Sequence, residues 1–340
     1  MTELRPIEII GGGLAGLALG TALSRVGVPT TVVEAGDYPR HRVCGEFITG
    51  LRPSTIARLG LAPILADALS HREVAWFIRD QPARVQRLPS PALGLSRFAL
   101  DARLAAAFVA AGGTLQTHTR VTDTSAPAGR VFATGRRRSR STWLGLKIHA
   151  RNLLLARELE LHLGDQGYVG LSRIEGGEVN ICGLFRRREL CAKGPDLILG
   201  YLQAAGLSAL VQRLAGAQLD PASFCAVAAV GFDRRVARAD RVRVGDTCAM
   251  IPPFTGNGMA MAFQSAEAVL DPLLAYAAGR LTWAACCRNC DRQLRRRFRV
   301  RLASAALLHP YFLQPRRQFW LASLNRAQLL PLRPLYALLH

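Results

Sequence analysis

A glycine-rich segment close to the start of the chain most constrains its fold. Residues 7–10 (IEII) have the length and apolar character of a buried strand, and three glycines follow them. The periodicity from Leu14 to Val26 is helical, Gly27 ends that helix, and residues 30–34 (TTVVE) predict a second strand. Together these residues form a strand–helix–strand unit, which predicts two parallel strands in one sheet.

The glycines of this unit follow the dinucleotide-binding pattern GxGxxG. Gly11 allows a tight turn, Gly13 lets the backbone approach a pyrophosphate, and Gly16 lets the helix pack closely on the strand. The N-terminus of the helix then faces the phosphates. Glu34 stands 18 residues beyond Gly16, at the end of the second strand, where a carboxylate can accept hydrogen bonds from a ribose. A glycine-rich turn in an ordinary α/β protein is the alternative.

A second strand–loop–helix element lies far along the chain. Residues 242–246 (VRVGD) predict a strand ending in Gly245 and Asp246, and residues 251–259 (IPPFTGNGM) lead into a helix from 258 to 278. Asp246 is suited to hydrogen bonding a sugar-alcohol hydroxyl, and the amides at 256–258 lie at a helix N-terminus that stabilises negative charge. Because Asp and Gly are common in turns, a plain strand–turn–helix is the alternative.

The segments between these two elements predict a second lobe. We expect helices at 55–69, 101–111 and 195–215, strands within 74–87 and at 131–133, and alternating strands from 144 to 185. The simplest arrangement is a discontinuous dinucleotide-binding domain (1–60, 95–142 and 238–290) with an inserted substrate domain (61–94 and 143–237). A basic amphipathic helical region (291–340) follows.

As a set, these segments resemble FAD-dependent oxidoreductases of the geranylgeranyl reductase and aromatic-ring hydroxylase-like flavoprotein family. The matching stretches, in the family's order, are GGGLAGLALGTALSRVG, VVEAGDYPRHRVCGEFITG, LSRFALDARL, ATGRRRSRS and GDTCAMIPPFTGNGMAMAFQSAE. The resemblance implies an α/β fold: a Rossmann-like FAD-binding domain, an inserted mixed β-sheet substrate domain and a helical C-terminal region. It also implies that FAD is the cofactor.

The resemblance assigns cofactor roles by position. Arg42 and Arg97 would lie along the cofactor, Cys44 and Gly45 would approach the flavin ring, and Asp246 would contact the ribitol. The complete set of expected cofactor-binding residues is Gly11, Gly13, Leu14, Ala15, Gly16, Glu34, Arg42, Cys44, Gly45, Arg97, Gly245, Asp246, Gly256, Asn257 and Gly258.

The candidate catalytic residues are Cys44, His149 and Tyr168. A thiol beside a flavin can be redox-active, although a free Cys is equally at home as a small buried apolar residue. His149 and Tyr168 follow or lie on apolar strands of the expected substrate lobe, as Asn180 does. The alternative for these side chains is structural hydrogen bonding. We expect no metal site, because the CxxC pair Cys287 and Cys290 has no partner pair or nearby His.

The chain departs from the family in two places. Hydroxylases of the family carry Asp-Gly where this chain has Thr134-Gly135. The missing aspartate disfavours direct use of NADPH, so NAD(P)H is only one option for the electron donor. The segment between Gly112 and Val131 is too short for the β-meander that the family places there, so we expect a trimmed flavin lobe.

The charge of the chain is strongly basic. There are 44 basic and 24 acidic residues, a formal net charge of +20, and all but two of the basic residues are arginine. Most arginines are scattered, as a GC-rich genome would produce. From Arg292 to His340, however, ten arginines and no acid alternate with Leu, Phe and Trp. This region either covers the substrate lobe or lies on an anionic membrane.

The predicted function is FAD-dependent oxidation or reduction of a hydrophobic small molecule, an isoprenoid, polyketide or quinone-like compound. The flavin would act by reduction, dehydrogenation or hydroxylation. A flavin- or nucleotide-binding protein without turnover is the first alternative, and a basic nucleic-acid binder ranks below it. We expect no nucleic-acid partner, since no stacking platform accompanies the arginines. With no secretory signal before the eight cysteines, we expect a cytoplasmic protein, with peripheral membrane contact as an option.

Overall fold

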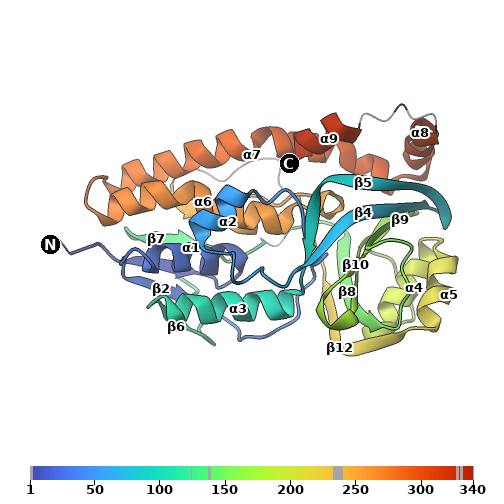
Figure 1. Cartoon of the computed structure of the whole chain (residues 1–340), viewed down its shortest axis with the longest axis horizontal. Helices are drawn as coiled ribbons and strands as arrows, with labels where there is room; N and C mark the ends of the chain where they lie inside the picture. The colour runs from blue at the N-terminus through green and yellow to red at the C-terminus, as the bar shows by residue number, and fades with distance from the viewer. Residues whose placement is uncertain are drawn as a thin grey trace.

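The computed structural model describes residues 3–123, 125–136, 139–232, 240–326, 329 and 332–339. Two sheets form the two halves of the molecule, and the C-terminal helices lie along its upper side (Figure 1). A parallel sheet with helices, a mixed sheet and a helical C-terminus confirm the expected fold class. The domain boundaries stay a prediction, and residues 233–239 of the expected inserted and returning segments fall outside the described residues.

The first sheet is parallel throughout and has the order β13-β7-β1-β2-β6. Its strands are β1 (Ile7–Ile10), β2 (Thr30–Val33), β6 (Thr114–Gln116), β7 (Arg130–Phe132) and β13 (Val242–Arg243). The strand that follows residue 240 is therefore hydrogen-bonded into the sheet that the first ten residues begin. This confirms that the βα pattern returns to the N-terminal unit late in the chain.

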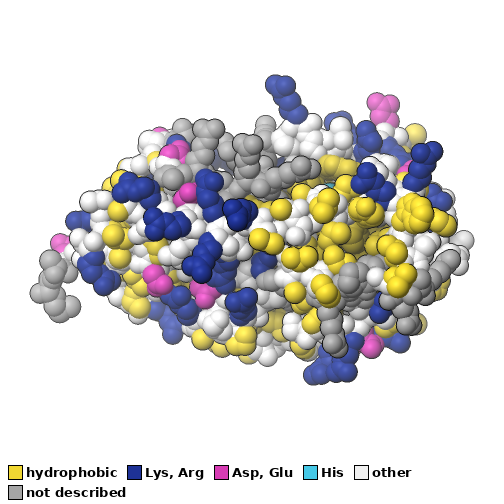
Figure 2. Space-filling view, turned by 90° about the horizontal axis from the view of Figure 1, so that it is seen from above, with side chains coloured by type: hydrophobic (Ala, Val, Ile, Leu, Met, Phe, Trp, Pro, Cys, Tyr) yellow, Lys and Arg dark blue, Asp and Glu magenta, His cyan; other side chains and the backbone are white. Residues whose placement is uncertain are grey.

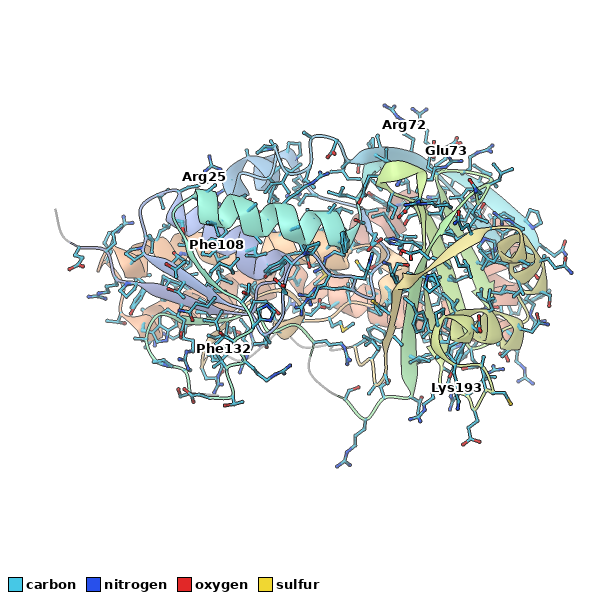
Figure 3. The ribbon with its side chains drawn as sticks, turned by 90° about the horizontal axis from the view of Figure 1, so that it is seen from below. Arg25, Arg72, Glu73, Phe108, Phe132 and Lys193 are labelled. Atoms are coloured by element: carbon cyan, nitrogen blue, oxygen red, sulfur yellow. The ribbon has the colours of Figure 1, made fainter. Side chains whose placement is uncertain are left out.

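Three helices pack together beside this sheet, α1 (Leu14–Ser24), α3 (Arg97–Ala110) and α6 (Gly258–Ala277). The first ten residues of α1 are all buried, and its glycines let neighbours approach closely. A Cβ added at Gly20 would lie 2.9 Å from the ring of Phe108, which α3 contributes (Figure 3). The small residues of α1 therefore place it at the centre of the largest apolar core.

The second sheet is mixed and has the order β12-β8-β11-β10-β9-β4-β5-β3. Its members are β3 (Phe47–Ile48), β4 (Leu69–Ile78), β5 (Gln81–Gly94), β8 (Trp143–Arg151), β9 (Leu159–Gly164), β10 (Gly167–Arg173), β11 (Val179–Arg186) and β12 (Gln218–Val227). The β4–β9 pair is parallel and the other pairs are antiparallel. The helices α4 (Leu197–Ala204) and α5 (Ser208–Ala215) pack against β8 and β12.

The structure corrects three local expectations. The helix expected at 55–69 is shorter, because α2 (Pro53–Leu59) ends at Gly60 in the left-handed conformation and β4 begins at Leu69. The strand β12 was not expected, because its sequence contains a proline and its pairing shifts register between Asp220 and Cys225. The helical segment 195–215 is two helices. Within the described residues between Gly112 and Gly129, β6 is the one strand.

The C-terminal region is helical, with α7 (Trp283–Leu313), α8 (Pro315–Arg326) and α9 (Leu332–Leu339). The long helix α7 runs along the top of the molecule and contacts β13 of the first sheet as well as β9 and β10 of the second (Figure 1). Residues 327, 328, 330, 331 and 340 of the expected C-terminal region fall outside the described residues. Among the described helices, none combines the length and the apolar character needed to cross a bilayer.

Candidate functional site

One cavity of about 1180 Å³ extends from the glycine loop after β1 to the strands of the mixed sheet. The segment at 245–259 and residues of α7, α8 and α9 complete its lining. Sites for one small molecule usually measure about 300–1,000 Å³. The cavity is therefore large enough for two occupants, one beside the parallel sheet and one beside the mixed sheet.

The glycine loop is closely packed at Gly11 and Gly16 and open to the cavity at Gly13. Gly11 has a φ of +111°, and a Cβ there would lie 2.3 Å from the carbonyl oxygen of Ala133. A Cβ at Gly16 would lie 2.0 Å from the carbonyl oxygen of Gly11, so this position closes the packing of α1 on β1. Gly13 faces open space and lines the cavity. Leu14 and Ala15 line it as well, whereas Gly16 does not.

Glu34 lies at the expected place, at the end of β2 and on the cavity wall. Its carboxylate accepts hydrogen bonds from the backbone amides of Gly12 (2.7 Å) and Gly36 (3.0 Å) and forms an ion pair with Arg40. Burial by itself would raise the pKa of Glu34, but these bonds and the charge of Arg40 outweigh it, and the pKa is lowered. Glu34 therefore stays ionised and fixes the glycine loop against β2.

Two arginines on the cavity wall share one buried carboxylate. Asp101 accepts two hydrogen bonds from Arg97, both 2.8 Å, and one of 3.0 Å from Arg42. Asp101 is fully buried, while both arginines line the cavity. One carboxylate balances only one of the two guanidinium charges, and Arg42 Nη2 is a buried donor without a partner. The wall thus keeps a positive charge suited to a phosphate.

The late segment reaches the glycine loop. A Cβ added at Gly245, whose φ is +61°, would lie 3.1 Å from the Cβ of Ala15. Asp246 lines the same cavity as Gly13, and burial raises the pKa of its carboxyl group despite the charges of Arg97 and Arg136. The structure therefore brings together the two elements that the sequence separates by more than two hundred residues.

The loop at 256–258 lies against β3 and the C-terminus. Gly256 and Gly258 line the cavity, and a Cβ at Gly256, whose φ is +67°, would lie 2.4 Å from the ring of Phe47. Asn257 is fully buried and is not on the cavity wall. Its side chain donates to the carbonyl oxygen of Leu339 (2.5 Å) and accepts from Thr49 (3.2 Å). Asn257 therefore connects this loop to α9.

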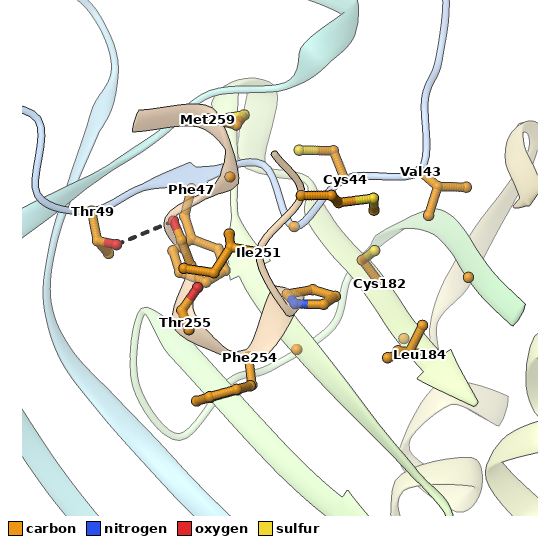
Figure 4. A pocket seen from close by; sticks show the side chains of 18 of the residues that line it. Val43, Cys44, Phe47, Thr49, Cys182, Leu184, Ile251, Phe254, Thr255 and Met259 are labelled. Atoms are coloured by element: carbon orange, nitrogen blue, oxygen red, sulfur yellow. Dashed lines mark hydrogen bonds between the residues drawn. The ribbon is translucent and has the colours of Figure 1, made fainter. Parts of the chain in front are cut away.

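The loop that carries Cys44 and Gly45 rests on the mixed sheet. Asn180 of β11 donates to the carbonyl oxygen of Cys44 (2.9 Å), and Ser172 of β10 donates to that of Gly45 (2.7 Å). Figure 4 shows Cys44 facing the same space as Cys182 of β11 and Ile251. Burial raises the pKa of the Cys44 thiol, so the thiol is protonated at neutral pH. A protonated thiol on this wall is compatible with a shape-determining role, and the catalytic role of Cys44 stays a prediction.

A buried ion cluster holds the end of this loop. Glu46, with a φ of +56°, accepts from Nε2 of His149 (2.7 Å) and from the backbone amide of Arg97 (3.0 Å). Its carboxylate also lies 3.6 Å from Nζ of Lys147, which is 3.0 Å from Nδ1 of His41. Glu46 and Lys147 are fully buried. No motif marks these two residues, since they meet only through the register of β8 against the loop.

His149 lies differently from the expectation. A catalytic role requires the ring of His149 to face the substrate, but the ring is buried and bonded to Glu46 on one nitrogen, with Glu178 3.3 Å from the other. It is not on the cavity wall. Because His149 and Lys147 are two apart on β8, they lie on the same face of the strand, the one that meets the loop.

The far end of the cavity is aromatic. Tyr168 lines it, and its hydroxyl oxygen accepts from the backbone amide of Phe254 (3.2 Å). The rings of Phe254 and Phe312 stack with centroids 4.0 Å apart, and Trp76 lies 5.8 Å from Phe312. Burial raises the pKa of Tyr168 well above its ordinary value and lowers that of the neighbouring His309 to about 4. Both side chains are neutral at neutral pH, which suits an apolar ligand.

Comparisons with known proteins agree with this geometry. The flavin-dependent brominase Bmp2 superposes with a TM-score of 0.76 at 18% identity, covering 98% of this chain and 92% of Bmp2. A Klebsiella pneumoniae HpxO variant complexed with FAD gives 0.74 at 17% identity, covering 95% and 94%. The chain has the fold of FAD-dependent monooxygenases. Pseudomonas aeruginosa PqsL in complex with 2-aminobenzoylacetate shares the monooxygenase fold at a TM-score of 0.73 and 14% identity, covering 92% and 97%.

At the level of sequence, the similarity is to a different activity. A menaquinone reductase of Mycolicibacterium smegmatis is 29% identical over 138 residues, which are 39% of this chain and 34% of that protein. The match thus spans about a third of the relative's length. No protein-family model matches the chain.

Proposed function

We propose that this protein is an FAD-dependent oxidoreductase that acts on an apolar small molecule. The observation that carries the proposal is the single cavity that joins the glycine loop and the paired arginines to an aromatic far end. A dinucleotide fits the first part, because Gly13 leaves its backbone accessible and Arg42 offers a buried, unpartnered donor. The second part remains available for a substrate.

In this proposal the residues of the first part hold the cofactor by position. Gly11 and Gly13 face the pyrophosphate, Arg42 and Arg97 supply positive charge along it, and Asp246 contacts the ribitol. Glu34 fixes the glycine loop and contacts the ribose. FAD, when bound, supplies the electron transfer, and the protein supplies binding, orientation and exclusion of water.

The substrate class follows from the far end of the cavity. Val74, Trp76, Ile78, Leu161 and Phe312 line it, and both Tyr168 on its wall and His309 behind the wall are neutral. Transfer of apolar surface from water to such a wall is favourable by about 25 cal/mol per Å². An isoprenoid, polyketide or quinone-like molecule suits it better than a charged metabolite.

Two reaction types compete. The match to a menaquinone reductase and the resemblance to geranylgeranyl reductases favour reduction of a double bond or quinone. The superposition on monooxygenases favours hydroxylation. Thr134 in place of the aspartate of the hydroxylases disfavours direct NADPH use and does not by itself separate the two reactions.

The test is purification without added cofactor, with identification of the released chromophore by mass. We expect FAD in about equal amount to protein, and oxygen consumption in step with substrate only for a hydroxylase. Gly13→Val should fold normally but lose FAD, because its Cβ meets open space on the cavity side. Gly216→Val, at a similarly uncrowded site after α5, is the control and should retain FAD. Colourless wild-type protein that cannot be reconstituted would refute the proposal.

A further inference from the structure

The C-terminal helices expose an unusual amount of apolar surface. Their exposed large apolar side chains include Leu307, Phe319, Trp320, Leu324 and Leu338, with Phe319 and Trp320 exposed by 65% and 63%. Figure 2 views this side from above and shows apolar side chains gathered around a hollow over the C-terminal helices and the β4–β5 hairpin. Contiguous apolar surface of this kind marks an interaction site.

The large cavity reaches the same surface. Tyr311 and Leu324 line the cavity and are also exposed, by 37% and 44%. Leu335, Tyr336 and Leu339 of α9 line the cavity from the same side. The apolar surface therefore surrounds the place where the cavity meets the outside.

A second hollow, of about 650 Å³, lies on the other side of α9. Among the described residues, its lining holds one acid, Glu267, and five arginines. The arginines are Arg52, Arg58, Arg296, Arg297 and Arg301. Glu267 is already engaged, since it accepts from Thr55 (2.8 Å) and pairs with Arg297 (2.7 Å). Arg58 pairs with Asp271 outside the lining, so the five guanidinium groups meet two carboxylates and the hollow keeps an excess of positive charge.

The arginines of this hollow are close enough for their positive charges to repel one another. Arg301 is buried and donates to Gln264 (2.7 Å). Burial, with the charges of Arg297 and Arg52, lowers its pKa to about 10. Phosphate is an anion that guanidinium groups bind with matched geometry, so this cluster of arginines suits a phosphate group.

The helix α9 connects the two hollows. Its Ala337 and Leu338 line the arginine hollow, while Leu335 and Leu339 line the cavity. Leu339 also accepts the hydrogen bond from Asn257, so the position of α9 depends on the loop at the cavity's inner end. The arginine hollow and exposed apolar side chains thus lie next to each other on one surface.

We propose that this surface, formed by α7–α9 and the arginine hollow, docks on an anionic lipid membrane. The arginine hollow takes lipid phosphate groups, and Phe319 and Trp320 enter the boundary of the acyl chains, as in other interfacial helices. The charge of the chain matches this partner, because the net of +20 is attracted to an anionic leaflet. A lipid-dissolved substrate would then enter the cavity beside α9, a consequence that rests on the proposed function, whereas docking itself does not.

The test is flotation of the purified full-length protein with vesicles of phosphatidylcholine alone or mixed with phosphatidylglycerol. We expect binding to the mixed vesicles only, and less binding as salt shortens the screening length from about 10 Å at 0.1 M to about 3 Å at 1 M. Arg52→Ser with Arg296→Ser should weaken binding about 25-fold, since each basic residue near an anionic surface contributes about fivefold.

Matched variants separate this surface from general charge. Arg187→Ser with Lys193→Ser removes the same amount of charge near α4; Figure 3 labels Lys193 in a view from below. This variant should weaken binding by no more than roughly twofold, because it reduces only the long-range attraction. Phe319→Ser with Trp320→Ser should reduce binding, and Val26→Ser with Val109→Ser, at side chains 57% and 53% exposed, should not. Equal losses in test and control variants, or no binding of the wild type to anionic vesicles, would overturn the proposal. FAD content, measured in parallel, reports on the proposed function separately.

Discussion

The buried pair of Glu46 and Lys147 gives the most demanding prediction. In Glu46→Gln the side chain keeps its size but loses its negative charge. The ammonium group of Lys147 then stays buried without the carboxylate that compensates its charge. At 3.6 Å, the attraction between two unit charges is about 5 kcal/mol with an effective dielectric constant of about 20. Losing one partner of a buried ion pair typically costs about 3–5 kcal/mol. We therefore expect a loss of about 4 kcal/mol in the free energy of unfolding.

The assay is a double-mutant cycle by urea unfolding. Lys147→Met alone should also destabilise, because Glu46 loses its nearest ammonium group, whereas Glu46→Gln with Lys147→Met removes both charges together. The double variant should recover at least about 2 kcal/mol relative to the sum of the single variants. Arg157 and Glu73 provide the control, an ion pair of 2.8 Å with both side chains at least 40% exposed, where the same cycle should give less than about 1 kcal/mol.

One result would refute the reasoning. Additive single changes, with a coupling below about 1 kcal/mol and so no larger than that of the exposed control pair, would mean that water reaches the cluster and that the two charges do not interact as a buried pair. The cofactor content of the double variant adds a further readout, because Glu46 also holds the backbone amide of Arg97.

Two other outcomes follow from local geometry. Gly16→Ala should destabilise by about 1–3 kcal/mol and lower the FAD content, because its Cβ would lie 2.0 Å from the backbone oxygen of Gly11; unchanged urea unfolding would contradict this. Burial opposes ionisation of Glu160, but bonds from His162 and Arg213 lower its pKa from 4.5 to about 2. This contributes about 3 kcal/mol of stability above pH 4.5, which is lost as the pH falls towards 2. Unfolding curves of Glu160→Gln between pH 2 and 6 should lack that component, and a slope equal to the wild type's would be the contrary result.

Much of the fold could be predicted because its signals are local. The strand, glycine loop and helix at the start of the chain are specified by residues that are neighbours in the sequence. The GxGxxG pattern followed by Glu34 predicts the backbone conformation of this unit directly. Alternating apolar residues from 144 to 185 likewise predicted β8 to β11. Predictions were weaker where one residue changes the outcome, as at Gly60, which ends α2 early, and in β12, where a proline and a register shift hide the pattern.

By itself, the sequence determined the parallel strand–helix–strand unit, the likeness to flavoproteins and the concentration of arginine near the C-terminus, because each resides in a contiguous run of residues. Only the tertiary structure decided that Gly245 lies against Ala15, that His149 turns from the cavity to Glu46, and that five arginines from two distant segments share one hollow. These are contacts between residues far apart in the chain. They depend on strand register and helix packing, which no local pattern specifies.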